Sequence, residues 1–368
     1  MTSTSDPSSR PPETDLGSIH RSEWGRLLSL LVVRSRRLDL AEDALAEAFA
    51  RAADSWPVGG VPDNPAAWLL TTAHRQVLGR LRAEEVAGRK APLLAVRSDW
   101  APPVDAGDVV GDERLQMILL CCHPALPSES RSALALRLVI GTSTEQIAKL
   151  FLVATPTMAA RLTRAKKKIV AVGIPLGAPA ADELHTRLDE VCRTIYLAFT
   201  AGYAPASGPD LVRSDLAEEA VELAKVLHRL VPDAPQVRAL LALLLMQHSR
   251  RRARTRNGRL VTLVEQDRSV WNHEEIRAGL ALVAGLRTSR GYGEELRLQA
   301  LIAAEHAKAP SASDTDWMSI ASRYAELEER TGSAVVRLNR AVAVAEAEGP
   351  RAGLLLLLPR DIARRDLR

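Results

Sequence analysis

Apolar residues recur at helical spacing along most of this 368-residue chain. Two clear stripes are Trp24, Leu27, Leu28 and Leu31, and Leu188, Val191, Cys192, Ile195 and Phe199. Side chains at these intervals lie on one face of an α-helix. Aromatic residues make up only 4% of the chain, whereas sandwiches and barrels need aromatic and β-branched strands. The sequence therefore predicts an all-α fold.

Several classes of protein are excluded by what the chain lacks. The longest apolar runs, Leu240–Met246 and Leu354–Leu358, are far shorter than the ~20 residues of a membrane span. No positively charged and then apolar segment marks a signal peptide near the N-terminus. Three cysteines, Cys121, Cys122 and Cys192, cannot form a disulfide framework, which favours a reducing compartment. We expect a soluble, cytoplasmic protein with no membrane partner.

Stretches rich in proline, glycine and small residues divide the chain into parts. The predicted parts are a disordered leader over 1–18, a helical module over 19–90, an acidic linker over 91–111, a second helical module over 112–172, and helical hairpins over 182–368. The hairpins are typical of a helical repeat array, although self-similarity near a 34-residue period is weak. The fold class is thus two small helical domains followed by a helical-hairpin array.

Positive charge is concentrated in the second helical module. The whole chain has a net charge of only +4, but residues 113–170 hold nine basic and three acidic residues, a net charge of +6. Residues 91–112 carry −3, and the long segment 171–368 carries +1. A compact basic module beside an acidic linker indicates a nucleic-acid partner for that module.

Residues 143–169 predict two short helices joined by a tight turn. Ser143 and Gln146 have the spacing of a capping box at the start of the first helix. Thr155 suits the N-cap of the second helix, and Pro156 suits its first position. The apolar face of this second helix consists of Met158, Leu162, Ala165 and Ile169. Five of the eight residues 161–168 are basic and none is acidic, which favours a helix-turn-helix.

A helix-turn-helix inserts the start of its second helix into the major groove, while basic residues along that helix bind phosphates. The residues predicted to face base edges are Thr155, Thr157, Met158 and Arg161. Those predicted to bind phosphates are Arg164, Lys167 and Lys168. The alternative is a solvated basic helix in an ordinary bundle, which carries charge but binds no DNA.

Taken together, these motifs resemble bacterial RNA polymerase sigma factors of the extracytoplasmic-function group, in the sigma-70 family. Asp39–Ala52 is similar to the region 2 helix, Asn64–Arg75 to the next helix, and Asp112–Lys168 to region 4. Cys121–Leu126 and Gln266–Trp271 resemble a subgroup with a C-terminal extension related to tetratricopeptide repeats. The resemblance implies two partners, core RNA polymerase and promoter DNA, with region 4 reading the −35 element and the acidic linker in the RNA exit path.

The resemblance also assigns a role to an acidic helix face. Asp39, Glu42, Asp43 and Glu47 fall at i, i+3, i+4 and i+8, so they share one side of a helix. In the family, this helix docks on the polymerase clamp. The alternative is a plain solvated face.

The next helix is expected to contact the −10 element. The candidate residues are Asn64, Trp68, Arg75, Arg80 and Arg82, with Trp56 beside the same loop. An aromatic side chain there would support a flipped base. Each has a structural alternative: Asn64 is a natural N-cap, the tryptophans can be core residues, and the arginines can be solvated.

The remaining motifs predict no catalysis, cofactor or metal. Adjacent cysteines in Cys121-Cys122-His123 lack the spacing of a zinc site, and their apolar neighbours favour core packing. The basic run 250–259 is either a solvated turn or a contact with DNA or an acidic surface. The extension would modulate activity through a regulatory protein or an intramolecular contact, and its last repeat should expose apolar surface. The alternative function is a stand-alone helix-turn-helix regulator with a ligand- or protein-sensing array.

Overall fold

The computed structural model describes residues 16–86, 113–172, 181–203, 214–257 and 259–358. Nearly all of these residues are helical, which confirms the all-α prediction. The helices gather into two compact units that divide between Leu184 and His185. The expected linker over 91–111, and the expected leader up to residue 15, lie outside the described residues.

The N-terminal unit begins with three long helices and continues with four shorter ones. These are α1 (Leu16–Ser35), α2 (Leu38–Gly59), α3 (Pro65–Val86), α4 (Glu113–Cys121), α5 (Ser128–Leu138), α6 (Thr144–Leu150) and α7 (Thr155–Val172). Helices α1, α2 and α3 pack against one another. Their contact faces bury side chains at the spacing seen in the sequence, including Leu27, Leu31, Leu45 and Val77, so the hydrophobic effect holds this bundle together.

Two boundaries differ from the sequence prediction. Helix α1 begins at Leu16 rather than after Ser18, because Ile19 is buried and extends the apolar stripe toward the N-terminus. Helix α2 continues through Pro57 to Gly59, where a break was predicted. The backbone turns out of the helix at Gly60, whose φ of 83° suits glycine, and its N–H donates to the Trp56 carbonyl at 3.0 Å.

Helices α4 to α7 form a second cluster that also contacts α1. Cys121 and Cys122 at the end of α4 are buried, as the core-packing interpretation predicts, and burial raises the pKa of the Cys121 thiol. On α1, the Trp24 side chain covers Gly141, which follows α5 and has a φ of 70°. Gly25 lies directly against the Val139 backbone. This close approach fixes α1 against the segment that leads into α6.

The C-terminal unit is a succession of helices with one short hairpin. Its elements are α8 (Ala181–Tyr203), α9 (Ser214–Leu230), α10 (Pro235–His248), η1 (Arg251–Ala253), β1 (Thr255–Arg256), β2 (Arg259–Leu260), η2 (Leu263–Glu265), η3 (Arg268–Val270), α11 (His273–Ala284), α12 (Gly291–Lys308), η4 (Ala312–Asp314), α13 (Trp317–Thr331), α14 (Ala334–Glu348) and α15 (Pro350–Leu355). Strands β1 and β2 are antiparallel, with Thr255 opposite Leu260.

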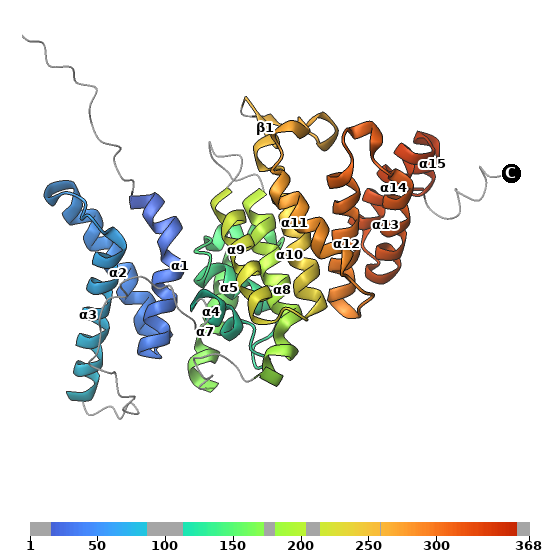
Figure 1. Cartoon of the computed structure of the whole chain (residues 1–368). Helices are drawn as coiled ribbons and strands as arrows, with labels where there is room; N and C mark the ends of the chain where they lie inside the picture. The colour runs from blue at the N-terminus through green and yellow to red at the C-terminus, as the bar shows by residue number, and fades with distance from the viewer. Residues whose placement is uncertain (1–15, 87–112, 173–180, 204–213, 258, 359–368) are drawn as a thin grey trace, which may run out of the picture. The chain divides into compact units, whose positions relative to one another are not determined.

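Neighbouring helices of this unit pack in sequence order. Helix α10 contacts α9, α11 and α12, and α13 contacts α12 and α14 (Figure 1). Helix α10 is buried on nearly every side, with ten buried residues from Val237 to His248, because it lies at the centre of these contacts. The C-terminal helices expose apolar side chains, including Val335, Leu338 and Leu354.

No helix in the described part of the chain contains an apolar stretch long enough to cross a membrane.

Candidate nucleic-acid interface

Helix α6 starts with the capping box predicted from the sequence. The Ser143 Oγ accepts a hydrogen bond from the Gln146 N–H at 3.2 Å, and the Gln146 Oε1 accepts one from the Ser143 N–H at 3.2 Å. This pair satisfies two backbone donors that have no partner within the helix. Ile147 is fully buried as predicted, whereas Leu150 and Phe151 are only partly buried. The capping box fixes where the first helix of the candidate motif begins.

The turn after α6 is a Schellman motif, a common way to end a helix. The Val153 N–H donates to the Ala148 carbonyl at 3.0 Å, and the Leu152 N–H donates to the Lys149 carbonyl at 3.2 Å. Leu152 occupies the left-handed position of this motif, with a φ of 53°. Its side chain is 92% exposed. Glycine is the usual residue there, so a leucine at this position does not mark the turn in the sequence.

Replacing Leu152 by glycine should stabilise the protein by about 0.5–1 kcal/mol. The left-handed conformation costs a non-glycine residue about 1–2 kcal/mol, and the greater freedom of glycine in the unfolded chain offsets part of the gain. Urea unfolding, followed by circular dichroism, measures the change. A lower unfolding free energy in the Leu152→Gly variant would show that the exposed leucine makes a stabilising contact instead.

Helix α7 begins at Thr155, one residue before Pro156, the first helical residue predicted from the sequence. The Ala154 carbonyl accepts from the Met158 N–H at 3.1 Å, so Ala154 takes the N-cap position and Thr155 is the first helical residue. Pro156 is therefore second in the helix, where its missing N–H still costs no hydrogen bond. The predicted apolar face is confirmed, since its members are all buried: Met158, Leu162, Ala165 and Ile169.

The opposite side of α7 is exposed and basic. Thr155, Thr157, Arg164, Lys167 and Lys168 are all exposed. The 18 residues of α7 include no acidic residue, so the positive charge on this side is not offset within the helix. Four of the candidate residues, Thr157, Arg161, Arg164 and Lys168, follow the i, i+4, i+7, i+11 spacing of one helical stripe.

Met158 cannot contact base edges in this structure. Its side chain has no exposed surface, because the helical period places it in line with Leu162, Ala165 and Ile169. Met158 therefore belongs to the apolar face, and its predicted contact with base edges is wrong.

Two basic residues of α7 are held by contacts inside the N-terminal unit. The Arg161 Nη1 donates to the Glu129 carbonyl at 3.4 Å, which orients the guanidinium toward the start of α5. The Lys166 Nζ binds both carboxylate oxygens of Glu42 on α2, at 2.6 and 2.7 Å. This ion pair joins the candidate DNA-binding helix to the candidate polymerase-binding face.

Each acidic residue predicted on α2 has a basic partner. Asp39 pairs with Arg37 at 2.8 Å, and Glu47 pairs with Arg51 at 2.7 Å. The hydrogen bond from Arg37 lowers the pKa of Asp39. Asp43 pairs with Arg80 at 3.2 Å. The four carboxylates do lie along one helix, but each is paired with a basic side chain, and two of these partners, Arg80 and Lys166, lie far away in the sequence.

Arg80 also pairs with Glu47 on α2, at 3.4 Å. This residue, which was predicted to contact the −10 element, is therefore bound to α2. Arg75 and Arg82 are exposed. Asn64 acts as the predicted cap of α3, because its Oδ1 accepts from the Ala67 N–H at 2.9 Å. Of the three arginines, Arg80 is therefore paired within the chain, whereas Arg75 and Arg82 face solvent.

The two tryptophans near the loop pack on each other. Trp56 is buried, while Trp68 is partly exposed, and their ring centroids lie 5.5 Å apart in an edge-to-face arrangement at 67°. Trp56 is therefore a core residue that supports the ring of Trp68. Trp68 keeps enough exposed surface to contact another molecule.

Comparisons with known proteins bear on both units. Residues 116–169, which cover most of α4 to α7, match the family model of sigma-70 region 4. Residues 187–286 match a family of unknown function (DUF6596). An uncharacterised protein from Rhizobium meliloti (strain 1021) is 42% identical over 331 residues, which are 88% of this chain and 78% of that protein. No solved structure matches the chain.

Proposed function

We infer that this chain, which belongs to the same family as the Rhizobium meliloti protein and carries a sigma-70 region 4 domain, is a sigma factor. It would bind core RNA polymerase in the cytoplasm and direct transcription initiation at specific promoters. The observation that carries this proposal is the exposed, acid-free basic face of α7, which follows a capped helix and a tight turn inside the segment that matches region 4.

The geometry of α7 supports DNA binding in a definite orientation. Its first turn is exposed at Thr155 and Thr157 and would enter the major groove, where base edges are read. Arg164, Lys167 and Lys168 lie further along the same helix and would bind phosphates. In the family this duplex is the −35 element.

The other parts of the proposal rest on the motifs in α2 and α3. We assign polymerase binding to Asp39, Glu42, Asp43 and Glu47, and −10 contacts to Asn64, Trp68, Arg75 and Arg82. Membership of the extracytoplasmic-function group and a tetratricopeptide-like C-terminal unit belong to the same proposal. The neighbour-on-neighbour packing of α9 to α14 supports the second point, and that unit would modulate activity.

Transcription with purified core RNA polymerase tests the proposal. The full chain is added to core polymerase on fragmented DNA from the source genome, and 5′ ends of the transcripts are mapped. We expect starts that share two upstream elements and depend on the added chain, together with co-elution of chain and core polymerase on size exclusion. Absence of both co-elution and chain-dependent starts would contradict the sigma-factor function.

One observation favours a second candidate, a stand-alone transcription regulator. All four predicted docking carboxylates are paired with cations of the same chain, so part of the charge that would bind the polymerase is already neutralised. A regulator of this kind would protect a defined duplex from nuclease digestion without core polymerase. Protection that requires core polymerase would instead favour the sigma factor.

Arg161→Ala should lower affinity for the selected promoter by about 1–3 kcal/mol and relax the preference at one upstream base pair. Arg161 lies one turn after Thr157 and is partly exposed, and its guanidinium would leave the Glu129 carbonyl to reach a guanine edge. Binding to promoter variants, measured by fluorescence anisotropy, separates two roles. Equal weakening of every variant would mean that Arg161 contacts a phosphate and not a base.

A further inference from the structure

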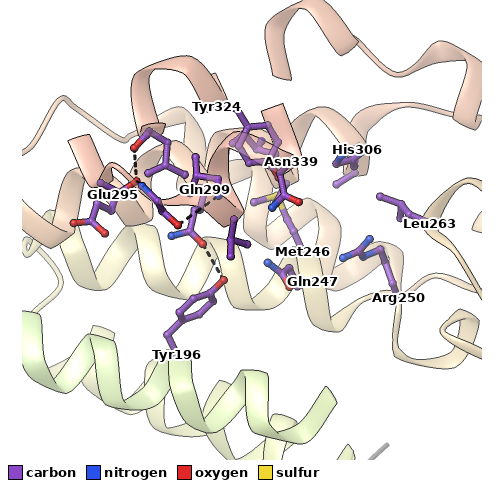
Figure 2. A pocket seen from close by; sticks show the side chains of 18 of the residues that line it. Tyr196, Met246, Gln247, Arg250, Leu263, Glu295, Gln299, His306, Tyr324 and Asn339 are labelled. Carbon is purple, nitrogen blue, oxygen red and sulfur yellow. Dashed lines mark hydrogen bonds between the residues drawn. The ribbon is translucent and has the colours of Figure 1, made fainter. Parts of the chain in front are cut away.

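The C-terminal unit contains a cavity of about 580 Å³. It lies among α8, α10, α12, α13 and α14 and is partly closed by the segment around η2 and η3. Figure 2 shows Arg250, Gln247, Tyr324 and Asn339 around this space, with Tyr196 hydrogen-bonded to Gln299 at one side, at 2.8 Å. A cavity of this size accommodates a small organic molecule.

The walls of the cavity combine apolar surface with a few polar groups. Met246, Trp271, Ile302 and Tyr324 provide apolar and aromatic surface. The polar groups include the amides of Gln247, Gln299 and Asn339. Such a mixed lining, with apolar and polar surface in similar amounts, suits a small molecule that has both an apolar part and a polar group.

The arginines near this cavity have different partners. Arg251 pairs with Glu275 at 2.9 Å, and Arg254 stacks on the Tyr203 ring at 3.9 Å. Arg268 donates to the carbonyls of His306 and Ala309, at 2.6 and 2.7 Å. These three guanidinium groups hold the fold together, so the basic run 250–259 is not simply a solvated turn.

Arg250 is the exception among them. Its guanidinium lines the cavity, and no carboxylate of the described residues lies within ion-pair distance of it. Its nearest ring contact is Trp271, at 5.9 Å from the centroid. Burial, with the nearby charge of Arg254, lowers the pKa of Arg250 to about 9. A cation in such surroundings gains from a bound anion, because the anion replaces the hydration that burial removes.

Two other titratable groups of the cavity, His306 and Glu295, do not take the place of an anion beside Arg250. Burial and the charges of Arg250 and Arg268 lower the pKa of His306 to about 4, so His306 is neutral at pH 7 and adds no second cation. Glu295 also lines the cavity, and among the described residues it forms no ion pair with Arg250. The cavity thus presents the cation of Arg250 beside an aromatic wall, with the carboxylate of Glu295 at the opposite side of the lining (Figure 2).

We propose that this cavity binds a small organic anion, with its acidic group on Arg250 and its apolar part against Trp271 and Tyr324. The ligand would contact the segment after α10, the segment after η3 and helix α13 together, so its binding would link parts of the unit that are distant in sequence. This proposal concerns the C-terminal unit and does not depend on DNA binding or on polymerase.

Binding of two fluorescent probes to the full chain tests the proposal. 8-Anilinonaphthalene-1-sulfonate is an apolar anion, and N-phenyl-1-naphthylamine is its uncharged analogue. We expect the wild-type chain to bind the sulfonate at least tenfold more tightly than the uncharged probe. Arg250→Gln should remove this preference, whereas Arg259→Gln, which changes an exposed arginine of the same basic run, should keep it.

A second variant locates the probe. Asn339 lines the cavity and is exposed, so Asn339→Trp can fill the space without disturbing the core and should weaken both probes. Circular dichroism and thermal melting confirm that each variant is folded. The proposal is overturned if the wild-type chain shows no preference for the sulfonate, if Arg250→Gln keeps that preference, or if Asn339→Trp leaves binding of both probes unchanged.

Discussion

Joint replacement of Arg164, Lys167 and Lys168 by glutamine should lower affinity for promoter DNA about a hundredfold at ~0.15 M salt. These three side chains are exposed on the face of α7 opposite its buried stripe. Each phosphate contact contributes a slope of about −0.9 to the dependence of log affinity on log salt concentration. The variant should therefore bind with a slope shallower by about 2.7, and it should weaken binding to all sequences alike.

Fluorescence anisotropy titrations at several salt concentrations measure both the loss and the slope. The matched control removes the same charge from the C-terminal unit by changing three exposed arginines, Arg229, Arg256 and Arg259, to glutamine. We expect the control to keep affinity within about threefold, since these arginines belong to the other unit and not to the phosphate-binding face of α7. Equal losses in both variants would mean that net charge, and not the α7 surface, determines binding.

The sequence was sufficient for features that depend on neighbours along the chain. Helical periodicity predicted the all-α fold, and the Ser143–Gln146 capping box and the Asn64 cap follow from residues three positions apart. The buried face of α7 follows from the same 3.6-residue period. The same period places Met158 on the buried face, so it cannot also contact base edges. The sequence alone already shows that these two roles are incompatible.

Features that depend on tertiary contacts were not predictable from sequence patterns. The pair Glu42–Lys166 joins residues 124 positions apart, and no local signal marks either partner. Within the run 250–259, Arg251 pairs with a carboxylate, Arg254 stacks on an aromatic ring, and Arg250 lines a cavity. Composition alone treats these three arginines as equivalent, because their roles are set by helices that lie elsewhere in the chain, both before and after the run.

Gly25→Ala should lower the free energy of unfolding by about 3 kcal/mol, whereas Gly79→Ala should raise it by about 0.5–1 kcal/mol. A Cβ at Gly25 would overlap the Val139 carbonyl oxygen, which belongs to the backbone and cannot turn aside as a side chain can. Overpacking of this kind costs about 1–3 kcal/mol, and we expect the upper end because α1 itself must shift. A Cβ at Gly79, in the middle of α3, meets nothing within 4 Å, so alanine there gains helix propensity.

The two substitutions form a matched pair, because both change glycine to alanine inside a helix. The loss of unfolded-chain freedom is the same in each, so their difference isolates the contact of α1 with the segment after α5. Urea unfolding followed by circular dichroism measures both values. A Gly25→Ala variant as stable as Gly79→Ala would mean that α1 does not approach Val139 closely in solution. A difference near 4 kcal/mol would show that this approach, and with it the packing of Trp24 on Gly141, is part of the folded state.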